Sequence, residues 1–191
     1  ERQWRATRDS GTFHVEPGPE LRPSPVALVG VRPCDLAAIA VQDRVLRDGS
    51  IPDAGYAGRR ARTLIVAAAC GTPSATCFCA SMGTGPALPA NGYDLGLVEL
   101  LDGRHRLIVD AASPIGEALL DELPTRAATV ADLAASAAVV NRAATAMGRR
   151  LDTEGVRDLL VNHPEHPRWD DVAARCLACG NCTLVCPTCF C

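Results

Sequence analysis

Two short, uninterrupted apolar runs stand out in the first half of the chain. Residues 26–31 and 63–69 contain no charged side chain, which is typical of strands buried in a parallel sheet. Between them, apolar side chains recur at near-helical spacing over residues 36–47, with Asp35 as the expected N-cap and Gly49 as the expected stop. This strand–helix–strand order predicts two parallel neighbouring strands in an α/β domain.

A different pattern follows the second run. Apolar residues over 93–101 and 105–110 flank an Asp-Gly pair at 102–103, which is a hairpin signal. The hairpin adds an antiparallel pair, so the sheet of this domain is predicted to be mixed. Ser113 is the expected N-cap of the helix that comes next.

Two segments of this half have weaker patterns. Phe13 and Val15 indicate a short strand within residues 1–25, which end in a proline-rich connector. Residues 50–62 are expected to form a polar surface loop. A docking patch for an acidic partner is the less favoured interpretation of its arginines, which are Arg59, Arg60 and Arg62.

The second half of the chain has helical periodicity. Amphipathic patterns predict helices over residues 129–150, 153–162 and 169–176. Prolines separate His163 from His166, so we expect a loop there and no shared metal-binding helix face. The predicted units are an α/β domain over 1–125, a helical connector over 126–168, and the first half of an α-helical ferredoxin module over 169–191.

Composition narrows the functional classes. The net charge of −3 and the absence of a long basic run argue against nucleic-acid binding, and no apolar stretch approaches the length of a membrane span. Ten cysteines without an export signal favour a reducing, cytoplasmic location. The chain begins at Glu1 and not at Met, so we expect the natural N-terminus to extend further.

The last sixteen residues contain the most specific motif, C-x2-C-x2-C-x3-C-P. This is the run with which bacterial-type ferredoxins hold a [4Fe–4S] cluster, and its fourth cysteine can ligate a neighbouring cluster. Structural zinc and a disulfide framework fit the spacing less well. The predicted ligands, called here the C-terminal cysteine run, are Cys176, Cys179, Cys182 and Cys186. No role is assigned to Cys189 and Cys191.

Four further cysteines are expected at the carboxyl edge of the predicted sheet, where open α/β sheets place ligands. This N-terminal cysteine group consists of Cys34, Cys70, Cys77 and Cys79. Four thiols match one more cubane, and the helix N-terminus beside Cys34 is expected to lower the pKa of that thiol. The alternatives are a buried core thiol at Cys34, and zinc or a redox thiol pair at Cys77 and Cys79.

Four stretches together resemble the iron–sulfur β subunits of cytosolic NiFe-hydrogenases (sulfhydrogenases), and the related anaerobic sulfite reductase A subunits. These stretches are 30–36 (GVRPCDL), 76–86 (TCFCASMGTGP), 92–95 (GYDL) and 175–191 (RCLACGNCTLVCPTCFC). The resemblance implies several [4Fe–4S] clusters and two kinds of partner, a flavin/NAD(P)H subunit and one or more catalytic subunits. The family pattern continues with a second cysteine run, so we expect a missing C-terminal segment that carries a further cluster.

The sequence thus predicts an electron-transfer subunit with no substrate chemistry of its own. It would relay electrons between the flavin subunit and a catalytic subunit of the hydrogenase or sulfite/sulfur reductase type. A zinc-stabilised interaction module without a redox role is the main alternative. A third hypothesis makes residues 1–125 an enzyme that uses Cys77 and Cys79 as redox thiols.

Overall fold

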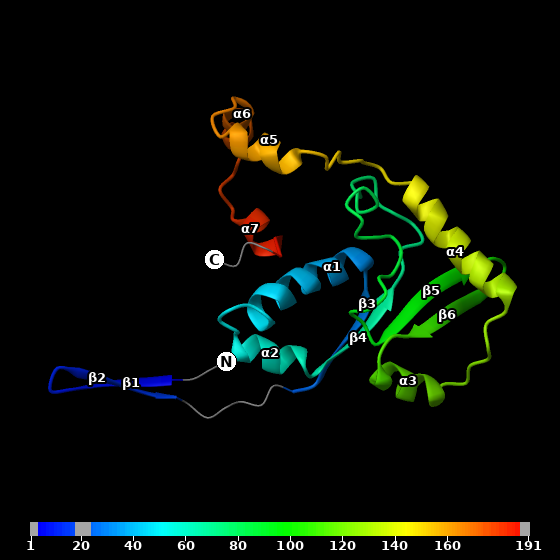
Figure 1. Ribbon diagram of the computed structural model, residues 1–191, viewed down its shortest axis with the longest axis horizontal. Helices are drawn as coiled ribbons and strands as arrows, with labels where there is room; N and C mark the ends of the chain where they lie inside the picture. The colour runs from blue at the N-terminus through cyan, green and yellow to red at the C-terminus, as the bar shows by residue number, and fades with distance from the viewer. Residues whose placement is uncertain (1–3, 18–23, 188–191) are drawn as a thin grey trace.

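The structure is a computed structural model that describes residues 4–17 and 24–187 (Figure 1). Its centre is a four-stranded sheet in the order β3-β4-β5-β6. The strands are β3 (Val26–Val31), β4 (Thr63–Ala68), β5 (Leu95–Leu101) and β6 (His105–Ala111). The first three run parallel, and β6 is antiparallel to β5. The sheet is therefore mixed, and its strands lie where the apolar runs and the hairpin signal predict them. The prediction that the run at 26–31 is buried is wrong, because β3 is the edge strand and five of its six residues are exposed.

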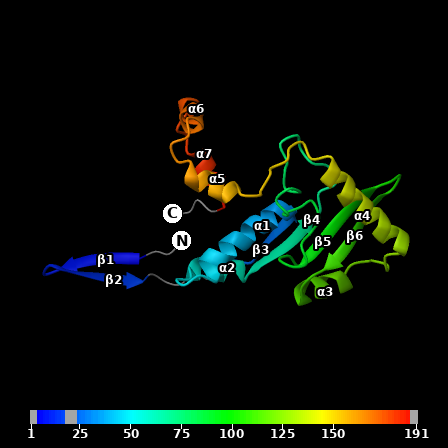
Figure 2. The ribbon, with the colours of Figure 1, turned by 45° about the horizontal axis from the view of Figure 1, so that its top comes forward.

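Helices cover the sheet and continue beyond it. They are α1 (Pro33–Gln42), α2 (Ala54–Arg60), α3 (Pro114–Asp121), α4 (Val130–Thr145), α5 (Val156–Asn162), α6 (Arg168–Ala174) and α7 (Asn181–Val185). Helix α1 contacts β4, α4 contacts β5 and β6, and α3 contacts β6. Figures 1 and 2 show α1 running alongside β3 and β4, and α4 alongside β5 and β6. In the part of the chain that the structure describes, no helix combines the length and apolarity needed to cross a membrane.

A separate two-stranded hairpin precedes the sheet. It consists of β1 (Trp4–Asp9) and β2 (Thr12–Pro17), so the strand predicted around Phe13 and Val15 is present. Phe13 and Val15 are 68% and 61% exposed. Figures 1 and 2 show the hairpin extending away from the sheet. It therefore contributes nothing to the position of the cysteines.

Helix α1 begins earlier than predicted. Arg32 occupies the N-cap position and Pro33 the first turn, so the prediction of Asp35 as N-cap is wrong. Proline is favoured there because the first helical N–H groups have no intrahelical acceptor. Asp35 lies at the third helical position, where its carboxylate accepts a hydrogen bond from the Arg32 N–H at 3.2 Å. Cys34 is therefore inside the first turn of the helix.

The loop predicted over residues 50–62 contains helix α2, which corrects that prediction. Asp53 caps this helix by accepting the N–H of Tyr56 at 2.7 Å. The buried carboxylate of Asp43 accepts the Tyr56 hydroxyl at 2.7 Å and also pairs with Arg47 and Arg60. These contacts bind α2 to the π-helical turn η1 (Asp43–Arg47) that follows α1. At least one arginine of the segment is thus structural.

The core of the domain lies between α1 and the sheet. Leu36, Ile65, Ala67 and Tyr93 are buried together, with Leu88 packed against them. This cluster places α1 against β4 and so determines where the helix starts relative to the strand ends.

Asp94 joins several elements at one point. Its carboxylate accepts the backbone N–H of Ile65 at 2.7 Å and the hydroxyl of Ser113 at 2.6 Å. Its backbone carbonyl accepts the N–H of Ala112 at 3.0 Å. Ser113 caps α3, as predicted, by accepting the N–H of Gly116 at 3.1 Å. One residue therefore connects β4, the end of β6 and the start of α3.

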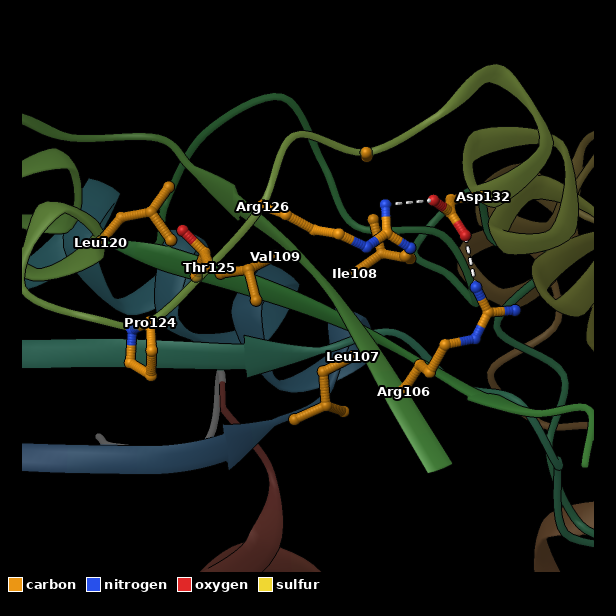
Figure 3. Close-up of a pocket in the computed structure, with 10 residues that line it drawn as sticks. Arg106, Leu107, Ile108, Val109, Leu120, Pro124, Thr125, Arg126 and Asp132 are labelled. Carbon is orange, nitrogen blue, oxygen red and sulfur yellow. Dashed lines mark hydrogen bonds and ion pairs between the residues drawn. The ribbon is translucent and has the colours of Figure 1, made fainter. Parts of the chain in front are cut away.

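Helix α4 is fixed to β6 by a buried carboxylate. Asp132 pairs with Arg106 of β6 and with Arg126, at the edge of a cavity of about 330 Å³ (Figure 3). Asp132 also accepts the backbone N–H and the hydroxyl of Thr129, at 3.0 and 2.8 Å. These hydrogen bonds, together with the arginines, hold the pKa of Asp132 far below its usual value. The Asp132 carboxylate therefore has a structural role, because its charge is already paired with Arg106 and Arg126.

Beyond α4 the chain turns towards the cysteines. The helix predicted to reach residue 150 ends at Thr145. His163 and His166 lie in the loop between α5 and α6, as predicted, and the His163 carbonyl accepts the Trp169 indole N–H at 2.9 Å. The helix predicted over 169–176 is α6.

Candidate metal centre

The carboxyl edge of the sheet brings the first two cysteines together. Because β3 and β4 are parallel neighbours, the chain leaves both strands at the same edge. Cys34 follows β3 in the first turn of α1, and Cys70 lies two residues after β4. The backbone N–H of Cys70 donates to the Pro86 carbonyl at 3.1 Å, which joins this strand end to the loop before β5.

That loop carries the other two thiols of the N-terminal cysteine group. The Cys77 N–H donates to the Ser74 carbonyl at 3.0 Å, and the Cys79 carbonyl accepts the N–H groups of Met82 and Thr84 at 3.1 and 3.0 Å. These are tight turns, so the positions of both cysteines are determined by backbone hydrogen bonds.

Gly85 allows the loop to approach α1. It has a φ of 154°, and a β-carbon on it would lie 3.2 Å from both the Cys79 sulfur and the β-carbon of Pro33. The Cys79 thiol is therefore close to Pro33, the residue that precedes Cys34 at the start of α1. The sequence signal for this contact is a glycine in a run of small residues, which does not by itself indicate a function.

Electrostatics shows the same convergence. Burial raises the pKa of the Cys79 thiol, and the charges of Cys77 and Cys70 raise it further. Partial burial likewise raises the pKa of Cys34, followed by the charges of Asp35 and Cys79. The expectation that the helix N-terminus lowers the Cys34 pKa is therefore wrong, because desolvation and two negative neighbours outweigh the backbone N–H groups.

If these four thiols ionised together, their charges would repel one another, and a positively charged metal group would relieve that repulsion. The surroundings also suit an iron–sulfur group, because Ser74 donates its backbone N–H to the Cys77 sulfur at 3.3 Å. Hydrogen bonds of this kind tune iron–sulfur clusters. In a cubane each of four iron atoms takes one thiolate, so the ligands stand around a cage. Among residues 4–17 and 24–187, no three His, Cys, Asp or Glu side chains group as ligands of a single ion.

The C-terminal cysteine run lies on a helix–turn–helix. Cys176 follows α6, Cys179 lies in the turn, Cys182 is in α7 and Cys186 ends it. The turn uses two left-handed residues, Ala178 at a φ of 50° and Gly180 at 71°, and the Ala178 N–H donates to the Cys176 sulfur at 3.4 Å. Three of these cysteines are exposed.

No disulfide joins any cysteine that the structure describes. Cys189 and Cys191 lie outside the described residues.

Comparison with known proteins gives one close match. The chain is 36% identical over 171 residues to "Sulfhydrogenase 2 subunit beta" of Pyrococcus furiosus, which covers 86% of this chain and 48% of that protein. The chain thus spans about half the length of this relative. No family model matches the chain, and no solved structure does.

Proposed function

The chain belongs to the family of sulfhydrogenase beta subunits, and we propose that it is an electron-transfer iron–sulfur subunit of an oxidoreductase complex. In this role it passes electrons between a flavin/NAD(P)H subunit and a catalytic subunit of the hydrogenase or sulfite/sulfur reductase type. It performs no substrate chemistry of its own.

The convergence of the N-terminal cysteine group at one sheet edge carries the proposal. A bound [4Fe–4S] cluster would supply a reversible one-electron store. The chain's residues would do the rest: four thiolates hold the group, and the Ser74 N–H withdraws charge from the Cys77 sulfur. Gly85 leaves room for the Cys79 sulfur beside α1.

The C-terminal cysteine run supports a second cluster in the same chain. Its spacing is specific for a cubane, and Cys179 lies in a tight turn between two left-handed residues, Ala178 and Gly180. Two clusters would make the subunit a relay with more than one station.

A zinc-stabilised interaction module is the alternative that the same thiols support. Zinc also binds clustered cysteines, but it brings no sulfide and no redox activity. A redox role for Cys77 and Cys79 alone would instead require activity with NAD(P)H in the absence of clusters.

The test is the iron, acid-labile sulfide and zinc content of anaerobically purified protein. Wild type is compared with Cys34→Ser, and Ala37→Ser on the same helix controls for the new hydroxyl. We expect equal amounts of iron and sulfide in wild type and in Ala37→Ser, with a partial loss of both in Cys34→Ser. Unchanged iron would remove Cys34 from the ligand set. Zinc without sulfide would refute the electron-transfer role.

A further inference from the structure

After α4 the chain crosses the loop that carries Cys77 and Cys79. Figures 1 and 2 show the segment after α4 passing beside the loop between β4 and β5. Residues 148–151, called here the strap, lie about 70 positions from that loop in sequence. The sequence assigns them only to a helical connector, so their contacts with the cysteine loop are a product of the tertiary structure.

Two backbone groups of the strap hydrogen-bond to the cysteine loop. The Arg149 N–H donates to the carbonyl of Cys77 at 3.1 Å. The Leu151 N–H donates to the hydroxyl oxygen of Ser81 at 3.0 Å, and that hydroxyl donates to the Phe78 carbonyl at 2.7 Å. The strap therefore contacts the loop on both sides of Cys79. Neither contact depends on the side chain of the donor residue.

Gly148 brings the strap against the backbone of the loop. A β-carbon on Gly148 would overlap the carbonyl oxygen of Ala75 and lie 2.6 Å from the α-carbon of Ala75. Contacts this short do not occur between real atoms, and backbone atoms cannot rotate away as a flexible side chain can. Only glycine permits this approach, so the glycine at position 148 has a structural reason.

These contacts lie close to the candidate ligands. The Arg149 N–H donates its hydrogen bond to Cys77 itself. The other two contacts are each two residues from a candidate ligand, with Ala75 before Cys77 and Ser81 after Cys79. Groups that orient metal ligands without binding the metal themselves typically change metal affinity by about 10–100-fold when they are altered.

We propose that the strap is a positioning element for the N-terminal iron–sulfur site: it holds Cys77 and Cys79 at the spacing that the cluster requires. This inference rests on the proposed function. The connector that leads to the C-terminal cysteine run is also hydrogen-bonded to the N-terminal site. The chain segment between the two cysteine groups is therefore anchored at one of them.

The experiment compares full-length variants in the natural complex. Gly148→Ala forces the strap away, and Arg149→Pro removes the N–H that donates to Cys77. Arg149→Ala is the matched control, because it removes the same charge and retains the N–H. Ser81→Ala and Ser81→Thr form a milder pair, in which threonine keeps the hydroxyl. Cys79→Ser identifies which electron paramagnetic resonance signal belongs to the N-terminal site.

Two quantities are measured for that signal: its midpoint potential, and the rate at which its iron is lost to a ferrous chelator. We expect Gly148→Ala and Arg149→Pro to lose iron about 10-fold faster or more, and to shift the potential. Arg149→Ala and Ser81→Thr should match wild type, and Ser81→Ala should lie between. The signal of the C-terminal cysteine run should stay unchanged in all of them, which distinguishes positioning from general unfolding.

Two failures can be told apart. If Cys79→Ser leaves iron and all signals unchanged, the proposed N-terminal site is wrong, and the strap has no cluster to position. If Cys79→Ser removes a signal but Arg149→Pro and Ser81→Ala leave its potential and iron loss unchanged, the strap inference is wrong and the proposed function stands. Should Gly148→Ala fail to fold, the Arg149 and Ser81 pairs still decide the question.

Discussion

Replacing Asp94 by alanine tests whether the sheet is held at one point. Asp94→Ala removes the acceptor of the Ile65 N–H at 2.7 Å and of the Ser113 hydroxyl at 2.6 Å. Hydrogen bonds to a charged group contribute about 1.5–3 kcal/mol each. Because Asp94 is only half-buried, we take the lower limit for both, so the variant is expected to lose about 3 kcal/mol of unfolding free energy.

Thermal unfolding followed by circular dichroism measures this loss. For a chain of this length, about 3 kcal/mol corresponds to a fall in Tm of about 6–12 °C. Asp121→Ala is the matched control, because it removes an exposed carboxylate from α3 and should change stability by about 0.5 kcal/mol or less. If the Tm values of Asp94→Ala and Asp121→Ala differ by less than about 2 °C, Asp94 does not hold β4 to α3.

Two predictions concern pH. Burial and the carboxylate of Asp43 raise the pKa of Tyr56 from 10.0 to about 12. The contribution of Tyr56 to stability is therefore complete below pH 10 and is lost as the pH rises towards 12. The alkaline fall in Tm should be shallower in Tyr56→Phe, and an identical fall in variant and wild type would contradict the role given to Tyr56. Hydrogen bonds from Thr129 and the pairing with Arg126 lower the pKa of Asp132 below 3.8, so its contribution is present above that pH and is lost as the pH falls below it. Acid titrations of stability should therefore be flatter in Asp132→Asn, and equal slopes in variant and wild type would show that the carboxylate is not held as described.

Patterns in the sequence were sufficient where a single local cause dominates. Strands β3 and β4 lie where the uninterrupted apolar runs at 26–31 and 63–69 predict them, although only β4 has buried residues and β3 is an exposed edge strand. The Asp-Gly turn determined the hairpin of β5 and β6 in the same way. The C-terminal cysteine run is also a local signal, since a cubane constrains the spacing of its ligands along one short segment, and the cluster itself stays a prediction.

Other features depend on residues that are distant in sequence. Helix α2 is stabilised by the buried carboxylate of Asp43, ten residues before its cap at Asp53, so its polar sequence looks like a loop. The pKa of Cys34 is raised by partial burial first and then by the charges of Asp35 and of Cys79, which is distant in sequence. A helix N-terminus considered alone predicts the opposite direction.

The sequence by itself thus determined which residues form the sheet and which cysteines are candidate ligands. Only the tertiary structure decided how the loop with Cys79 packs against the start of α1, because Gly85 brings together residues that are distant in sequence. The strap is the clearest case: Gly148 and Arg149 act through backbone atoms. Every residue except proline carries the same backbone N–H, so a pattern of side chains in the sequence cannot predict such contacts.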